Sequence, residues 1–208
     1  MLTLENISFK FQENILFKNI NLTILPGSIF LIKGPNGSGK TTFLKIIAGL
    51  LSPLSGMVKW NKIHIKEDMN TYNKYCASFH STKHVLKPEL TILENLEFWA
   101  SITNHYELIL PALQHFKLIE FADIKCQKLS SGLLQRASLA RLIIRHTGLW
   151  IMDEPDAYLD LETKESLQKL ITVKAREGGT VILSSHGLTE FPVTSTILLE
   201  DFKPQRHS

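Results

Sequence analysis

The spacing of hydrophobic residues in the first fifty positions predicts strands and then a helix. Apolar and polar residues tend to alternate over residues 2–11 and 15–25, which predicts two strands joined by a polar turn. Residues 28–33 form an almost continuous apolar run and predict a buried strand. Apolar residues then recur every three or four positions over residues 41–51, which is the spacing of a helix.

Helical spacing dominates the middle of the chain. Residues 57–60 and 63–65 predict a short hairpin, and a strand is expected at residues 76–79. Between residue 90 and about residue 123, Trp99 and the other apolar residues follow helical spacing, which predicts a helical insert.

The last third of the chain returns to alternating strands and helices. Residues 149–152 and 180–184 predict buried strands on either side of an amphipathic helix over residues 161–175. Strands that alternate with helices indicate a parallel α/β sheet, whose sites lie at the carboxyl ends of the strands.

Length and composition indicate one domain and exclude several classes of protein. The 208 residues, 44% of them hydrophobic, suffice for one substantial core. The net charge of +3 is spread along the chain, so nucleic acid is not an expected partner. Cys76 and Cys126 form no C-x-x-C pattern, which argues against a disulfide framework or a zinc site.

The N-terminus lacks the layout of a signal peptide, and no apolar run reaches the roughly 18 residues that cross a bilayer. Any membrane role is therefore expected to act through a partner.

A glycine-rich segment between the predicted strand and helix has the pattern of a phosphate-binding loop. The residues that match G-x-x-x-x-G-K-[ST] are Gly34, Pro35, Asn36, Gly37, Ser38, Gly39, Lys40 and Thr41, followed by Thr42. Glycines let backbone N–H groups point inward around a polyphosphate, and the helix that follows adds the positive end of its dipole. Lys40 can then reach the β- and γ-phosphates, and the Thr41 hydroxyl can ligate Mg²⁺.

Two adjacent carboxylates follow the predicted strand at residues 149–152. Asp153 can bind Mg²⁺ through water, and Glu154 can polarise the water that attacks a γ-phosphate. A phosphate loop occurs in kinases, GTPases and many ATPases, so the loop alone does not identify the reaction. The acidic pair favours nucleotide hydrolysis among these reactions.

A third segment carries a family resemblance. Leu129, Ser130, Ser131 and Gly132 precede a predicted helix that contains Gln135, Arg136 and Arg141. This segment resembles the signature of ABC ATPases, in which serine and backbone N–H groups grip the γ-phosphate held by the opposite subunit. Without the resemblance, either serine is simply an N-cap.

The resemblance implies a fold, cofactors and a second copy. It implies an α/β fold with a P-loop NTPase (ABC ATPase) core, an N-terminal antiparallel β subdomain and a helical insert. The core is expected at residues 1–85 and 136–208, and the helical subdomain at residues 86–135. ATP and Mg²⁺ are the implied cofactors, and a head-to-tail pair of chains that sandwiches ATP is the implied assembly.

Smaller matches extend the resemblance over nearly the whole chain. Phe11 stands where the family places an aromatic residue against adenine, and Leu159 and Asp160 match the loop after the acidic pair. His186 follows a predicted strand, where it can hold Glu154 and the attacking water in line.

The chain departs from the family pattern at two places. In most of the family the signature continues with glutamine after the position of Gly132, but here it continues with Leu133 and Leu134. Leucine cannot donate a side-chain hydrogen bond, which predicts a weaker grip between subunits. The family's Mg²⁺-sensing glutamine is also missing. Ungapped spacing places Thr82 there, and a two-residue insertion places His80 there.

Within the family, the chain is most similar to the ATP-binding subunits of the haem exporters used in cytochrome c maturation. The resemblance rests on the compact length, the phosphate loop, the run Val58–Trp60, residues 90–99 and Ser131. It implies a place on the cytoplasmic face of a bacterial inner membrane, bound to separate membrane-spanning subunits. The histidines show no haem-attachment motif.

The partner is expected to dock on residues 86–124, where Trp99, Tyr106 or Phe121 can serve as anchors. The alternatives are an ABC transporter subunit with another cargo, a non-transport ABC ATPase and a P-loop kinase. A kinase is disfavoured by the signature segment.

Overall fold

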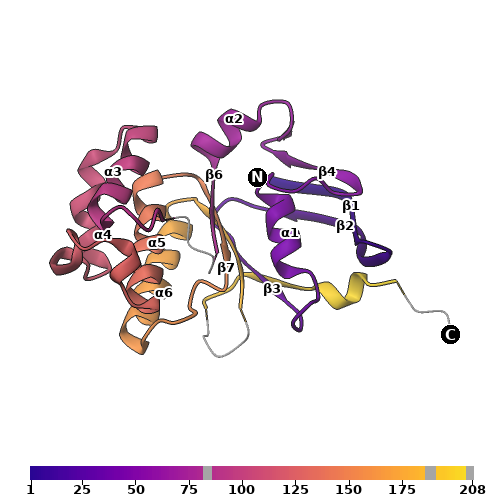
Figure 1. Ribbon diagram of the computed structural model, residues 1–208. Helices are drawn as coiled ribbons and strands as arrows, with labels where there is room; N and C mark the ends of the chain where they lie inside the picture. The colour runs from indigo at the N-terminus through magenta and orange to yellow at the C-terminus, as the bar shows by residue number, and fades with distance from the viewer. Residues whose placement is uncertain (82–85, 186–190, 205–208) are drawn as a thin grey trace.

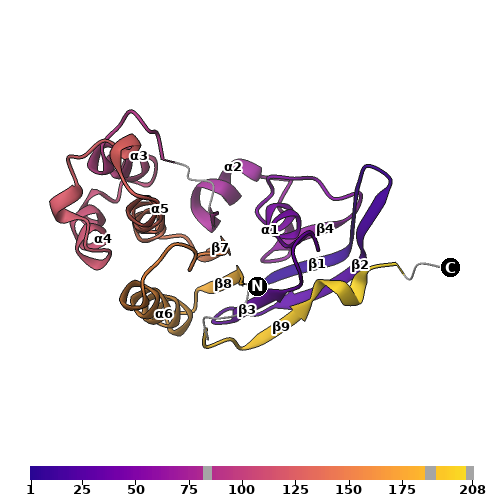
Figure 2. The same ribbon diagram turned by 60° about the horizontal axis from the view of Figure 1, so that its bottom comes forward.

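A computed structural model describes residues 1–81, 86–185 and 191–204 of the chain. Within these residues the chain forms two sheets and a group of helices. The smaller sheet and the helices α3 and α4 lie at opposite ends of the molecule, with the larger sheet between them (Figures 1 and 2).

The smaller sheet is antiparallel and has the strand order β2-β1-β4-β5. Its strands are β1 (Leu2–Phe11), β2 (Asn14–Ile24), β4 (Ser55–Trp60) and β5 (Ile63–His64). The two N-terminal strands and the hairpin predicted from the sequence are therefore confirmed, and together they form the expected antiparallel subdomain.

The larger sheet is parallel and has the strand order β6-β7-β8-β3-β9. Its strands are β3 (Ile29–Lys33), β6 (Ala77–His80), β7 (Leu149–Asp153), β8 (Thr180–Ser184) and β9 (Ser195–Leu198). All five side chains of β7 and of β8 are buried, because helices cover both faces of a parallel sheet, and this explains their continuous apolar runs. Strand β9 was not predicted: only Ile197 among its residues is buried, so it has no apolar pattern.

The main helices are α1 (Lys40–Ile47), α2 (Met69–Thr71), α3 (Ile92–Thr103), α4 (Ile109–His115), α5 (Ser131–Arg145) and α6 (Leu161–Arg176). The remaining turns are a π-helical turn at Tyr72–Cys76 and 3₁₀ turns at Tyr106–Leu108, Ile119–Phe121, Cys126–Lys128 and Leu199–Phe202.

Two predicted boundaries of helices and strands differ from the observed ones. Helix α1 ends at Ile47 and not at residue 51, because Gly49 adopts a φ of 72° that ends the helix. The strand expected at residues 76–79 begins at Ala77, since Cys76 belongs to the π-helical turn. The division between helical subdomain and core at residue 135 stays a prediction; helix α5 contains that position and continues to Arg145.

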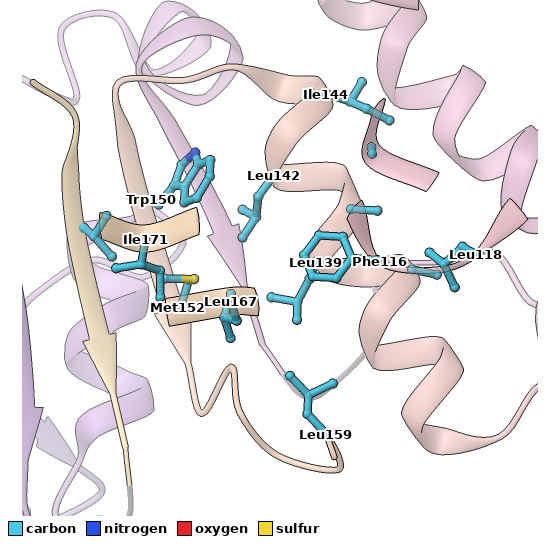
Figure 3. Close-up of a cluster of buried hydrophobic side chains, with 14 of the residues drawn as sticks. Phe116, Leu118, Leu139, Leu142, Ile144, Trp150, Met152, Leu159, Leu167 and Ile171 are labelled. Carbon is cyan, nitrogen blue, oxygen red and sulfur yellow. The ribbon is translucent and has the colours of Figure 1, made fainter. Parts of the chain in front are cut away.

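Two hydrophobic clusters hold these elements together. One lies between the parallel sheet and helices α3 to α6, where Leu139 and Leu142 of α5 pack with Trp150 and Met152 of β7 (Figure 3). The other joins the antiparallel sheet to α1 and the opposite face of the parallel sheet. The helical insert is therefore attached to the sheet by a continuous apolar core.

The helices are short relative to a bilayer. In the part of the chain that the structure describes, none of them combines the length and the apolar content that a membrane crossing requires.

Candidate active site

The glycine-rich loop connects the carboxyl end of β3 to the first residue of α1. Gly34 has a φ of 152° and Gly39 a φ of 99°, a region that favours glycine. A Cβ on Gly34 would also lie 2.6 Å from the Ser38 Oγ. Both glycines are therefore required by the loop conformation.

Lys40 lies over this loop at the start of α1. Its Nζ donates hydrogen bonds to the carbonyl oxygens of Gly34, at 2.7 Å, and Pro35, at 3.1 Å. Burial lowers the pKa of Lys40, and the nearby carboxylates of Glu154 and Asp153 act in the opposite direction. The ammonium group thus stands inside the loop with the acidic pair close to it.

The first turn of α1 leaves its backbone N–H groups available. The N-cap is Gly39, which has no side chain to accept hydrogen bonds from them. The Ser38 Oγ is buried and has no hydrogen-bond partner within the described residues. Free N–H groups, an unpaired hydroxyl and an ammonium group form a cradle suited to phosphate oxygens.

A cleft of about 490 Å³ opens beside this cradle. The residues predicted from the sequence that line it are Phe11, Asn36, Gly37, Gly39, Lys40, Thr41, Thr42 and Glu154. Leu16 of β2 also lines the cleft and was missed, because a strand leucine carries no signal for binding. Phe11 is 63% exposed at the end of β1, so its ring is accessible to a ligand.

Asp153 is held at the carboxyl end of β7 by two hydroxyl groups. The Thr41 Oγ1 donates to its Oδ2 at 2.5 Å, and the Ser184 Oγ donates to its Oδ1 at 2.6 Å. Thr41 and Asp153 therefore bring two oxygen donors together, which is the ligand type that Mg²⁺ prefers.

Glu154 follows Asp153 in an unusual backbone conformation. Its φ is 50°, in the left-handed region, and its N–H donates to the Ser184 Oγ at 3.1 Å. Ser184 therefore contacts both acidic residues, although the sequence analysis did not assign it a role. The sequence signal that could have found it is its place at the end of a predicted buried strand, and the structure shows that this place is opposite Asp153.

Comparisons with known proteins agree with this geometry. Residues 17–157 match the family model described as ABC transporter. The chain belongs to the ABC transporter family. It is similar to the cytochrome c biogenesis ATP-binding export protein CcmA of Rickettsia felis, with 41% identity over 89% of this chain and 93% of that protein. The CcmA of Rickettsia bellii is 39% identical over 96% of this chain and 99% of that protein.

Solved ABC cassettes share the fold. A dimeric ATP-binding cassette in a post-hydrolysis state, bound to ADP and Pi, has a TM-score of 0.88 and 29% identity, covering 99% of this chain and 97% of that one. A dimeric bacterial ABC transporter cassette has a TM-score of 0.87 and 28% identity, covering 95% of this chain and 94% of that one. The α/β architecture with its antiparallel sheet and helical insert is thus confirmed. The chain is an ATP-binding subunit of an ABC transporter, and its ATP hydrolysis is coupled to transport.

The segment that resembles the ABC signature lies at the N-terminus of α5. Ser130 is the N-cap, and its Oγ accepts a hydrogen bond from the Leu133 N–H at 3.3 Å. Ser130 and Ser131 are exposed, and Gly132 approaches the loop after the acidic pair, where an added Cβ would lie 3.1 Å from the Tyr158 oxygen. None of these three residues lines the cleft beside the phosphate loop of the same chain.

The residues that depart from the ABC pattern lie in or against the protein interior where the structure describes them. Leu133 and Leu134 pack against the apolar core beside α5. His80, the last residue of β6, is fully buried, and its ring lies near Gln135 and Ser138 of α5. Thr82 and His186 lie outside the described residues.

Proposed function

We propose that this chain is the ATP-hydrolysing subunit of a bacterial export complex that serves cytochrome c biogenesis, with haem as the cargo. Its similarity to CcmA proteins, which extends over nearly the full length of both chains, supports this assignment. The proposal that the chain hydrolyses ATP at this site rests on one observation. Lys40, Thr41 and Glu154 line the same cleft, and the Asp153 carboxylate accepts a hydrogen bond from Thr41.

The residues of the cleft have separate roles in this proposal. Backbone N–H groups of residues 34–42 and the Lys40 ammonium group bind the β- and γ-phosphates, while the exposed Phe11 ring stacks on adenine. Thr41 and, through water, Asp153 would hold Mg²⁺, which supplies positive charge to the phosphate oxygens when bound.

Glu154 is the proposed general base. Its carboxylate lies at the cleft beside Lys40, where it can accept a proton from the water that attacks the γ-phosphate. His186, which the resemblance assigns to the same step, is proposed to keep Glu154 and that water in line.

Substitution of Glu154 tests this assignment. We expect Glu154→Gln to retain ATP affinity and to lose at least about 100-fold in kcat, the usual scale for a positioned general base. Lys40→Ala should weaken both binding and hydrolysis. Glu165→Gln, a change at an exposed position of α6, is the matched control and should hydrolyse ATP at the wild-type rate. Unchanged turnover in the Glu154 variant would remove that residue from the mechanism.

A second copy of the chain is proposed to complete the site. Ser130, Ser131 and Gly132 stand at an exposed helix N-terminus away from their own cleft, so they are placed to reach nucleotide held by another chain. The similar cassettes solved as dimers support this arrangement. The Glu154→Gln variant should therefore accumulate as a dimer in ATP and Mg²⁺, which size-exclusion chromatography would detect.

The membrane-spanning partner is proposed to dock at a cavity of about 260 Å³ beside Trp99, here called the docking cavity. Its lining comprises Ala48, Leu50, Asn73, Ala77, Phe79, Trp99, Arg141 and Arg145. The guanidinium groups of Arg141 and Arg145 lie 4.7 and 5.4 Å from the centre of the Trp99 ring.

Unpaired donors support that choice of surface. The buried Trp99 Nε1, Arg141 Nε and Arg145 Nε have no hydrogen-bond partner among the described residues. Carbonyl or carboxylate oxygens of a cytoplasmic segment of the partner can accept these bonds. Of the other proposed anchors, Tyr106 is 52% exposed, whereas Phe121 packs against the core. Binding at this cavity would place the chain on the cytoplasmic face of the inner membrane.

A further inference from the structure

Gln135 connects the signature helix to the peptide that follows Glu154. It lies in the second turn of α5 and is fully buried. Its Nε2 donates a hydrogen bond to the Pro155 carbonyl oxygen at 3.0 Å. A buried amide of this kind restrains the backbone that it contacts.

The contacted backbone needs such restraint. A residue before proline favours extended conformations with negative φ, yet Glu154 has a φ of 50°. Strained backbone conformations of this type persist where several surrounding contacts hold them in place, often at functional sites. The Glu154 N–H donates to the Ser184 Oγ, and the carbonyl oxygen of the following residue, Pro155, accepts from Gln135. The base is thus fixed from both sides by residues of two different elements.

His80 lies on the other side of the Gln135 amide, whose orientation is fixed by the Pro155 oxygen. The His80 Nε2 lies 3.2 Å from the Gln135 Nε2, and the His80 Nδ1 lies 3.2 Å from the Ser138 Oγ. An amide nitrogen only donates, so the His80 Nε2 is the acceptor of this contact. The reversed amide would place the Gln135 Oε1 against the Pro155 oxygen, which is repulsive.

The elements that carry these residues are firmly attached to one another. Leu139 and Leu142 of α5 pack against Met152 of β7 (Figure 3), and His80 pairs in register with Met152. The hydrogen-bond chain therefore connects three elements whose relative positions the core already determines.

We propose that Gln135 is a positioning residue for ATP hydrolysis. By holding the Pro155 carbonyl, it sets the direction of the Glu154 carboxylate toward the cleft, while the same amide nitrogen also contacts His80. The inference rests on the proposed role of Glu154 as the base. It also means that the helix carrying the signature segment and the base of the same chain are mechanically linked.

The test is a comparison of kinetic constants in the full-length protein. Gln135→Met keeps the approximate size of the side chain and removes both N–H donors. We expect kcat for ATP hydrolysis to fall about 10- to 100-fold, the scale of a misplaced catalytic group, with KM within about twofold of wild type. Gln114→Met, at an exposed position of α4, is the matched control and should leave both constants unchanged.

A double variant separates positioning from a merely structural effect. If Gln135 acts through Glu154, adding Gln135→Met to Glu154→Gln should cause no further loss of residual hydrolysis. Independent losses that multiply would overturn the proposal. Gln135→Asn, which keeps the amide but is too short to reach both partners, should also lower kcat and serves if the Met variant does not fold.

The outcomes distinguish this proposal from the one on which it rests. Wild-type kcat in both Gln135 variants, together with an inactive Glu154→Gln variant, would refute only the positioning role. An active Glu154→Gln variant would refute both.

Discussion

Ser184→Ala removes a single hydroxyl group that bonds both acidic residues, and the structure predicts a large effect on stability. The Ser184 Oγ is buried, donates to the Asp153 carboxylate at 2.6 Å and accepts from the Glu154 N–H at 3.1 Å. Alanine leaves a carboxylate oxygen and a backbone N–H without this partner. Asp153 is buried, so water does not readily replace the bond that its carboxylate loses, whereas Glu154 is half-buried and lines the cleft.

The magnitude follows from the two lost bonds. A hydrogen bond to a charged group contributes about 1.5–3 kcal/mol and a neutral one about 0.5–1.5 kcal/mol, so the free energy of unfolding should fall by about 2–4.5 kcal/mol. Ser78→Ala is the matched control in the same sheet. It removes one hydrogen bond of the Thr147 hydroxyl, which can still donate to the Leu149 carbonyl oxygen. The free energy of unfolding should therefore fall by only about 0.5–1.5 kcal/mol.

Urea titration of both variants without nucleotide measures these differences, because bound ATP would add its own stabilisation. The Ser184 variant should also hydrolyse ATP more slowly, since it loses a restraint on both acidic residues. If Ser184→Ala is no more destabilising than Ser78→Ala, the reasoning about the buried carboxylate is wrong.

Two further predictions concern other parts of the molecule. Burial lowers the pKa of His115 below its ordinary value of 6.5, so the unfolded state binds the proton more readily and stability should decrease as pH falls below about 6.5. Urea titration at pH values from about 5.5 to 7.5 should show a weaker acid dependence for His115→Gln than for wild type. At the docking cavity, Leu50→Asp should reduce co-purification of the membrane-spanning subunits without changing ATP affinity, whereas Leu110→Asp, a similarly exposed position on α4, should not. Equal yields from the two variants would argue against this docking surface.

Local chemistry made the phosphate loop predictable. The glycines at positions 34 and 39 take positive φ values, Lys40 must lie at a helix start, and a buried strand must precede them. Each of these requirements concerns neighbouring residues, so the order of residues alone carries it. The same holds for β7 and β8, whose apolar runs reflect burial on both faces.

Helix α1 and strand β9 show where apolar spacing fails as a signal. The apolar spacing continues past Ile47, but Gly49 ends the helix, which is a local cause that apolar spacing does not include. Strand β9 pairs with the edge of β3, and its own residues show no pattern of burial, so tertiary contacts decided it.

From its sequence alone, this protein can be recognised as a nucleotide-binding subunit with a phosphate loop, an acidic pair and a signature helix. Only the tertiary structure reveals that Ser184 holds both acids and that Gln135 reaches the Pro155 carbonyl. Such contacts join residues far apart along the chain, and the side chains involved have no distinctive spacing. Their roles depend on sheet register and helix packing, which arise only when the whole core forms.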